Sequence, residues 1–173
     1  QMKIASISED KNIEKRVSIT PEIAKKYLSN GFEVSLSKNY GDHLGFSNKE
    51  YESLGVKLTE NNKDVIKDSD IVIQLGLPTD EHLSYFQENQ ILIGVLNPYS
   101  NKNKLDELKK KKINMFSLEL LPRITRAQSM DILSSQANLA GYKAVVESFA
   151  YFQKAIPMMM TAAGTIPAAK VLV

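Results

Sequence analysis

The sequence feature that most constrains the fold is a pair of short apolar runs near the middle of the chain. Asp70–Leu75 and Ile91–Leu96 are rich in Ile, Val and Leu, and the first is closed by Gly76-Leu77-Pro78. Continuous rather than alternating apolar character is typical of strands that are buried on both faces of a parallel sheet. The two runs therefore predict a sheet that helices cover on both sides.

Strand and helix signals alternate along the rest of the first two thirds of the chain, with short connections between them. Thr20 followed by Pro21 is typical of a helix start, and Asn30-Gly31 of a helix end. The further strands are expected at Lys3–Ser8, Glu33–Ser37, Val56–Leu58 and Ile113–Leu118, and the further helices at Ser47–Leu54, Thr79–Glu88 and Asn101–Lys112. With right-handed crossovers, this alternation predicts an α/β fold, a flavodoxin-like doubly wound parallel sheet.

Composition excludes several classes of function. The 22 basic and 20 acidic residues are interspersed and give a net charge of +2, so no nucleic-acid partner is expected. There is no Cys, which excludes disulfides, thiolate metal sites and Cys nucleophiles and suits a reducing cytoplasm. His43 and His82 are not at metal-ligand spacing, so no metal site is expected. No apolar run approaches the length of a membrane span, so we expect no direct membrane insertion.

A polar stretch opens what is predicted to be the longest helix, from Ala127 to Phe152. On a helical wheel one arc carries short polar side chains and Tyr, at Asp131, Ser134, Ser135, Asn138 and Tyr142, and the opposite arc carries a core face, at Met130, Leu133, Ala137, Ala140 and Ala144. Ser, Asn and Asp are mediocre helix formers. Their concentration favours a ligand surface, and a merely polar helix start is the alternative.

The last part of the chain predicts the beginning of another unit. Ala168–Val173 is expected to be the first strand of a truncated Rossmann domain, because such a strand normally precedes a Gly-rich turn that does not follow here. Met158–Met160 are expected to pack in a core. The predicted organisation is a first domain at 1–126, a long connecting helix at 127–153 and the start of an NAD-binding domain at 154–173.

The stretch Arg123–Tyr142, RITRAQSMDILSSQANLAGY, closely resembles the signature of the α subunit of proton-translocating NAD(P) transhydrogenase. Glu14–Pro21 and Thr161–Pro167 also resemble segments of that subunit. The resemblance covers essentially the whole chain but only the front of the subunit. In the family, a nucleotide-binding domain with a Gly-x-Gly turn follows at once, and a C-terminal segment returns to complete the first domain.

The resemblance implies hydride transfer between NAD(H) on this subunit and NADP(H) on a partner subunit, coupled to proton translocation. By carry-over, Arg123, Gln128, Asp131 and Ser134 hold the nicotinamide and ribose, with Gln128 and Asp131 as the catalytic residues. Arg126 is a further cofactor-binding candidate, and for both arginines the alternative is a salt bridge at the helix entry. Such chemistry needs aligned rings more than acids and bases.

The same resemblance implies partners and a place in the cell. We expect a homodimer that assembles with NADP-binding and membrane-embedded transhydrogenase components. The subunit is then cytoplasmic and peripheral to the inner membrane through those partners.

Alanine dehydrogenase is the nearest alternative family, and it shares the Arg-Val-x-x-Thr-Pro motif at Arg16–Pro21. That family uses a Lys at the position of Gly76 and a His at the position of Asn97. Without these acid–base groups Arg16 has no catalytic partners, so it is interpreted as structural.

A non-enzymatic flavodoxin-like module, such as a phosphate-receiving domain, is a hypothesis from another class. Glu9 and Asp10 after the first strand fit it superficially. No Asp follows the strand Ile71–Leu75 as a phosphate acceptor, which disfavours this hypothesis.

Overall fold

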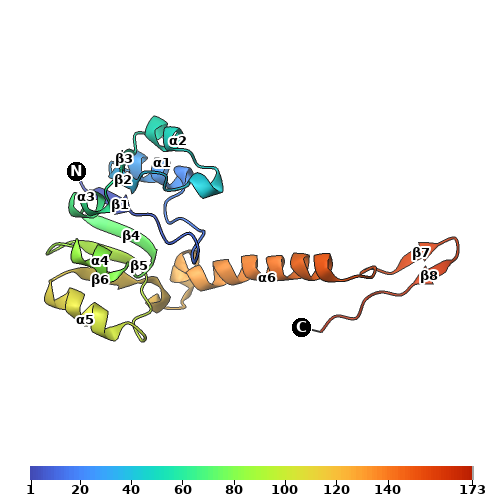
Figure 1. Cartoon of the computed structure of the whole chain (residues 1–173). Coiled ribbons are helices and arrows are strands. Elements are labelled where there is room, and N and C mark those ends of the chain that lie inside the picture. The colour runs from blue at the N-terminus through green and yellow to red at the C-terminus, as the bar shows by residue number, and fades with distance from the viewer. Residues whose placement is uncertain (173) are drawn as a thin grey trace. The chain divides into compact units, whose positions relative to one another are not determined.

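The computed structural model describes residues 1–172, and these fall into two compact units. The first unit runs from Gln1 to Pro122 and the second begins at Arg123, slightly before the predicted domain end at residue 126. The first unit contains a sheet with helices around it, and the second contains a long helix and a hairpin (Figure 1).

The first unit is built on a six-stranded sheet with the order β3-β2-β1-β4-β5-β6, in which neighbouring strands are parallel. The strands are β1 (Lys3–Ser6), β2 (Glu33–Ser37), β3 (Lys57–Thr59), β4 (Ile71–Gly76), β5 (Ile91–Val95) and β6 (Asn114–Ser117). This confirms the predicted doubly wound parallel sheet. Without the short edge strand β3 the order is flavodoxin-like, and with β3 it is the order of dinucleotide-binding sheets.

Short helices connect these strands: α1 (Pro21–Ser29), η1 (Asp42–Leu44), α2 (Asn48–Leu54), α3 (Asn62–Lys67), α4 (Asp80–Ser84), α5 (Lys102–Lys110) and η2 (Leu118–Leu120). The side chains of Thr20, Ser47 and Thr79 accept a main-chain N–H three residues on and cap α1, α2 and α4. These caps confirm the predicted helix starts and explain why each crossover is short.

Each face of the sheet carries its own apolar core (Figure 1). On one face Ala5, Val72 and Leu92 pack with residues of α3, α4 and α5, namely Val65, Ile66, Leu83 and Leu108. On the other face Ile4, Val34 and Leu36 pack with Ala24 of α1 and Tyr51 of α2. The opposite orientation of successive strand residues produces the two layers.

The second of these cores does not extend over β5 and β6. Ile93 pairs with Phe116, and Val95 follows Ile93 on the same face. Phe116 is 58% exposed and Val95 36% exposed, whereas Leu92 on the opposite face is fully buried. Within residues 1–172, this half of the sheet therefore has one apolar face that is left open.

The second unit begins with the 3-10 segment η3 (Thr125–Met130), continues as α6 (Ile132–Tyr151) and ends in an antiparallel hairpin of β7 (Met159–Thr161) and β8 (Gly164–Ile166). The predicted start of the long helix at Ala127 was wrong. Asp131 has extended backbone angles and is the N-cap of α6, so the residues before it form a tighter turn instead.

Two expectations for the end of the chain were also wrong. Residues 168–172 form no strand; instead the N–H of Ala169 donates to the carbonyl of Ile156 at 2.9 Å. A strand needs a neighbour for its N–H and C=O groups, and the described sheet pairing of this unit is the hairpin, which no sequence pattern had predicted. Val173, the last residue of the predicted strand, lies outside the described residues.

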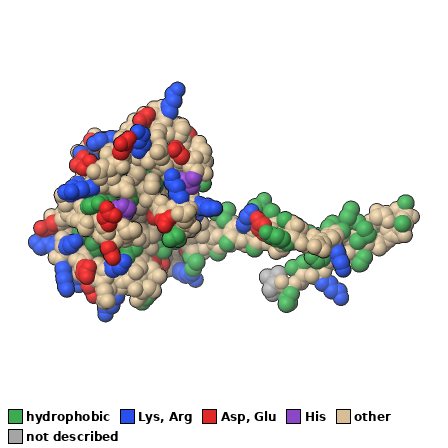
Figure 2. Space-filling model, viewed as in Figure 1, with side chains coloured by type: hydrophobic (Ala, Val, Ile, Leu, Met, Phe, Trp, Pro, Cys, Tyr) green, Lys and Arg blue, Asp and Glu red, His purple; other side chains and the backbone are tan. Residues whose placement is uncertain are grey.

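The expected core packing of the second unit is not seen either. No residue of α6 is buried among those described, and the methionines Met158–Met160 are exposed. Figure 2 shows hydrophobic side chains along this helix and hairpin. Within the described chain, no helix combines the length and the hydropathy that crossing a membrane requires.

Candidate functional site

A crevice of about 720 Å³ lies in the first unit, at the carboxyl ends of β1, β4 and β5. Strand order reverses between β1 and β4, and ligands of open α/β sheets bind outside the carboxyl ends of the strands at such a point. The lining includes residues 7–10, Ile13, Glu14, Arg16, residues 74–79, His82, Val95 and Asn97. The fold therefore places loop residues from both halves of the sheet around one hollow.

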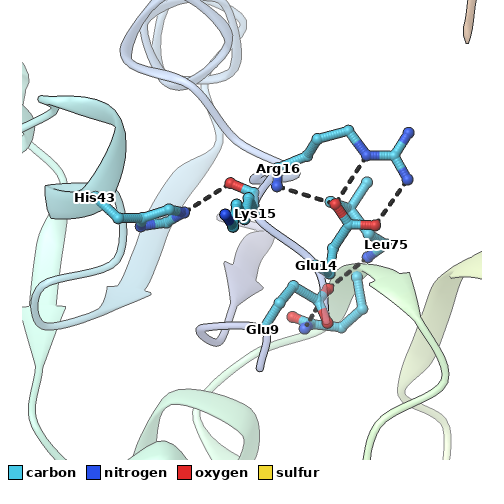
Figure 3. Close-up of polar contacts among 7 residues, drawn as sticks. Glu9, Glu14, Lys15, Arg16, His43 and Leu75 are labelled. Atoms are coloured by element: carbon cyan, nitrogen blue, oxygen red, sulfur yellow. Dashed lines mark hydrogen bonds and ion pairs between the residues drawn. The ribbon is translucent and has the colours of Figure 1, made fainter. Parts of the chain in front are cut away.

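Glu9 ties the loop after β1 to the end of β4 (Figure 3). Its carboxylate accepts the main-chain N–H of Leu75 at 2.7 Å and the side-chain amide of Gln74 at 3.1 Å. Burial is the largest influence on this carboxyl and raises its pKa, the negative charge of Glu14 adds to the rise, and the hydrogen bonds oppose it. Glu9 thus occupies donors of the crevice with the chain's own carboxylate.

Beneath Glu9, a buried polar network joins β1, β4 and the segment that leads into α1. The Gln74 carbonyl accepts the Ser6 hydroxyl at 2.9 Å and the Ile7 N–H at 2.8 Å. Ser6 also shares a hydrogen bond of 2.8 Å with the hydroxyl of Tyr40, which accepts the N–H of Ser18 at 3.0 Å. Gln74 was missed from the sequence, although a lone amide inside an apolar strand is a usable signal because a buried polar group needs partners.

Arg16 is held by Glu14 of its own loop (Figure 3). Its Nε donates to Oε1 at 2.9 Å and its Nη2 to Oε2 at 2.7 Å, and this side-chain bonding lowers the pKa of the Glu14 carboxyl. His43 of η1 contacts the same loop through the carbonyl of Lys15 at 2.7 Å. This geometry supports the structural interpretation of Arg16.

The crevice offers little acid–base chemistry. Gly76 and Asn97 supply no titratable group at the two positions where alanine dehydrogenases would carry Lys and His. The lining imidazole, His82, lies 3.3 Å from the side-chain nitrogen of Asn62. Within the described residues, no group of three or more His, Cys, Asp or Glu side chains is placed to hold a metal ion.

The predicted site residues lie in the second unit, at the start of α6. Asp131 Oδ1 accepts the N–H groups of Leu133 and Ser134 at 3.0 and 3.3 Å, and Oδ2 accepts the Ser134 hydroxyl at 2.8 Å. The Ser134 hydroxyl is the largest influence that lowers the pKa of Asp131, and the charge of Arg123 acts in the same direction. The structure therefore brings Asp131 and Ser134 into direct contact, with Arg123 near enough to influence them.

Gln128 and Arg126 lie in the η3 turn just before this pair. The N–H of Asp131 donates to the carbonyl of Gln128 at 3.2 Å, so the turn and the helix cap share one residue. The Gln128 and Arg126 side chains are exposed. Within residues 1–172, the ion pairs include neither Arg123 nor Arg126, so the helix-entry salt bridge is not observed.

The predicted polar arc is therefore divided between a cap and a helix. Ser134, Ser135, Asn138 and Tyr142 are on α6 and exposed, whereas Asp131 stands before the helix as its cap. The arrangement presents an amide, a carboxylate, a hydroxyl and two guanidinium groups within a short exposed segment. These groups can orient a polar ligand, but they contain no nucleophile paired with a base.

The N-terminal domain family described as "Alanine dehydrogenase/PNT, N-terminal domain" matches residues 6–140, and the chain belongs to it. Over 99% of its length the chain is 42% identical to the first of the polypeptides that make up NAD(P) transhydrogenase subunit alpha in Rickettsia prowazekii (strain Madrid E), and 40% identical to its counterpart from Rhodospirillum rubrum. It covers 46% of each. The predicted resemblance to transhydrogenase α subunits is thereby confirmed.

A solved structure gives the same relationship. The transhydrogenase from Sinorhizobium meliloti superposes with a TM-score of 0.87 at 39% identity, over 96% of this chain and 50% of that chain. Alanine dehydrogenase 1 of Staphylococcus aureus (strain Mu50) is 30% identical over 89% of this chain and 40% of its own length. This chain thus spans about half the length of the relatives it matches.

Proposed function

We propose that the chain is the N-terminal portion of the NAD(H)-binding subunit of a nicotinamide nucleotide transhydrogenase. In this function a hydride passes directly between NAD(H) on this subunit and NADP(H) on a partner subunit, coupled to proton translocation. The observation that carries the proposal is the exposed turn and helix cap at Arg123–Ser134, where Asp131 and Ser134 are already bonded to each other. Its residues match those expected from the transhydrogenase resemblance.

The groups of this segment suit a nicotinamide riboside. The nucleotide supplies the hydride chemistry when bound, and the protein supplies orientation. Asp131 accepts hydrogen bonds and Ser134 both donates and accepts, which fits ribose hydroxyls. Arg123 provides donors for the carboxamide oxygen, and the exposed amide of Gln128 reaches toward the second nucleotide. Ring alignment, rather than proton transfer, is the task of these residues.

The proposal assigns the pyrophosphate to another part of a longer subunit. Dinucleotide sites hold the pyrophosphate at a Gly-rich turn and a helix N-terminus directly after a strand. In the described residues the loop after β1 carries Glu9 and Asp10 instead, and their charges repel phosphate. The curated relatives are about twice as long, and we assign the pyrophosphate site to the additional length.

The open face of β5 and β6 supports the same proposal. A parallel sheet is normally covered on both sides, yet Phe116 and Val95 are exposed here. We propose that a further segment of the longer subunit covers them. The assembly proposed is a homodimer that joins NADP-binding and membrane-embedded components and lies on the cytoplasmic side of the inner membrane.

An alanine dehydrogenase is the second candidate, because the switch-point crevice contains Arg16. Two observations weigh against it. Glu14 engages the guanidinium of Arg16 through two hydrogen bonds, and Gly76 and Asn97 provide no acid or base.

One pair of assays on the longer subunit distinguishes the two functions. The subunit is mixed with its NADP-binding partner, and reduction of an NADP analogue by NADH is recorded. The same subunit is then given pyruvate, ammonium and NADH. We expect hydride transfer to the analogue and no oxidation of NADH in the second mixture. Reductive amination without transfer between nucleotides would contradict the proposal.

A further inference from the structure

The segment that leads from the sheet into the proposed site is anchored by a carboxylate. After β6 the chain turns through η2 and reaches Arg123 by way of Leu121 and Pro122. Within η2, Glu119 Oε1 accepts the main-chain N–H of Asn97 at 2.5 Å. Its Oε2 accepts the hydroxyl of Ser117 at 2.6 Å, so both oxygens are engaged.

The receiving end of this contact is the turn after β5. Asn97 has a φ of 48°, in the left-handed region, and its carbonyl accepts the N–H groups of Ser100 and Asn101 at 3.1 and 3.0 Å. Successive N–H groups in a turn with a left-handed residue form an anion-binding concavity. The N–H of Leu96 also reaches the Ser117 hydroxyl at 3.3 Å. The carboxylate of Glu119 therefore fills a concavity formed by the backbone.

Partial burial is the largest influence on Glu119 and raises its pKa, but the hydrogen bonds from Ser117 and from main-chain N–H groups outweigh it and lower the pKa below the ordinary value. The side chain is thus charged at neutral pH. A charged acceptor makes stronger hydrogen bonds than a neutral one.

Little freedom remains between this anchor and the proposed site. Leu121 has extended angles, φ −59° and ψ 132°, as the residue before a proline prefers. Pro122 has a fixed φ. The direction in which η2 points is therefore passed on to Arg123 through two restricted residues.

We propose that Glu119 is a positioning residue for hydride transfer: by clamping η2 to the turn after β5, it fixes the root of the segment that carries Arg123 and Gln128. This inference rests on the proposed function. Glu119 contacts neither nucleotide and acts through the segment that it holds. A displacement of reacting groups on the order of 1 Å costs about a hundredfold in rate.

The test uses the longer subunit with its NADP-binding partner, single-turnover hydride transfer, and equilibrium binding of NADH. Glu119→Ala is expected to lower the transfer rate about tenfold or more, with NADH affinity changed less than about threefold, because alignment and not binding is lost. Glu119→Gln is expected to stay within about threefold of the unmodified rate. Its amide oxygen still accepts the Asn97 N–H and its amide nitrogen donates to Ser117.

Three further variants separate positioning from stability. Glu60→Ala removes an exposed carboxylate that pairs only with Lys38 at the surface, and it is expected to behave as the unmodified subunit. Asn97→Gly keeps the N–H and suits the left-handed backbone, so it is also expected to transfer normally. Ser117→Ala removes one of the two contacts and is expected to give an intermediate rate, which retains a test if Glu119→Ala fails to fold.

The outcomes are distinct. Normal transfer by folded Glu119→Ala, or by Ser117→Ala if Glu119→Ala does not fold, overturns the inference. Loss of transfer in Glu119→Gln equal to that in Glu119→Ala also overturns it, because the hydrogen bonds would then be insufficient. Absence of transfer in the unmodified subunit with its partner contradicts the proposed function itself.

Discussion

At the scale of single residues, the account depends on Asp131. Its sequence position predicted a place on the polar arc of a long helix, but its carboxylate instead caps α6 and accepts the hydroxyl of Ser134. Asp is among the preferred N-cap residues, and it precedes an apolar pair here, so a capping signal was present in the sequence. The residue remains in the predicted site, and its local role is now defined.

The Asp131–Ser134 bond predicts a measurable titration. Because the Ser134 hydroxyl is the main influence that lowers the pKa of Asp131 below 3.8, Ser134→Ala should move the midpoint upward. A carboxyl whose pKa is lowered on folding stabilises the start of α6 above its unfolded pKa, and this stabilisation is lost as pH falls through the folded pKa. NMR titration of the Asp131 carboxyl in both proteins checks this. Identical midpoints would contradict it.

Tyr40 provides a prediction for the network beneath the crevice. Its buried hydroxyl contacts Ser6 and accepts the N–H groups of Ser18 and Ile19. Tyr40→Phe leaves these groups without a partner and should reduce the free energy of unfolding of the first unit by about 2 kcal/mol. Tyr27→Phe is the control, since the Tyr27 hydroxyl has no hydrogen bond among the described residues. Equal urea midpoints for the two variants would disprove the role of the network.

At the scale of elements, sequence patterns predicted the first unit well and the second unit poorly. The runs Ile71–Leu75 and Ile91–Leu96 became β4 and β5, and capping residues such as Thr20 marked helix starts correctly. Those features are local and agree with the packing. The hairpin β7–β8 was missed because its strands are only three residues long and entirely exposed. The polar network escaped because its partners, such as Ser6 and Gln74, are far apart in sequence.

Close contact between β4 and β5 gives a prediction for the sheet. A Cβ on Gly94 would lie 2.4 Å from the main-chain oxygen of Gln74, and that backbone cannot move without breaking the strand pair. Gly94→Ala should cost about 2 kcal/mol of unfolding free energy. Gly76→Ala in the neighbouring strand is the matched control, because nothing lies within 4 Å of its added Cβ. Denaturant unfolding should show a loss for Gly94→Ala only, and a shared loss would refute the contact.

At the scale of the whole molecule, the two units leave apolar surfaces that the described residues do not cover. Phe116 on the sheet and Leu139, Val145 and Phe149 on α6 are exposed. Contiguous apolar surface of this kind is typical of interfaces. It agrees with a chain that spans about half of its relatives, and composition alone did not indicate it.

Nucleotide binding follows from the same organisation. The 173-residue chain is expected to show no saturable heat with micromolar NADH in isothermal titration, because no Gly-rich turn and helix N-terminus in residues 1–172 hold a pyrophosphate. The longer subunit is expected to bind under the same conditions. A micromolar dissociation constant for the short chain would contradict the assignment of the pyrophosphate to the additional length.

The central claim is that the segment at the start of α6 aligns two nucleotides for hydride transfer, and Gln128→Ala in the longer subunit tests it most directly. Stopped-flow transfer to NADP(H) on the partner and equilibrium NADH binding are measured for this variant and for Gln153→Ala, an exposed amide after the end of α6. The account predicts a transfer rate lowered about a hundredfold for Gln128→Ala, with NADH affinity nearly unchanged, and normal transfer for Gln153→Ala. Normal transfer by Gln128→Ala would contradict it.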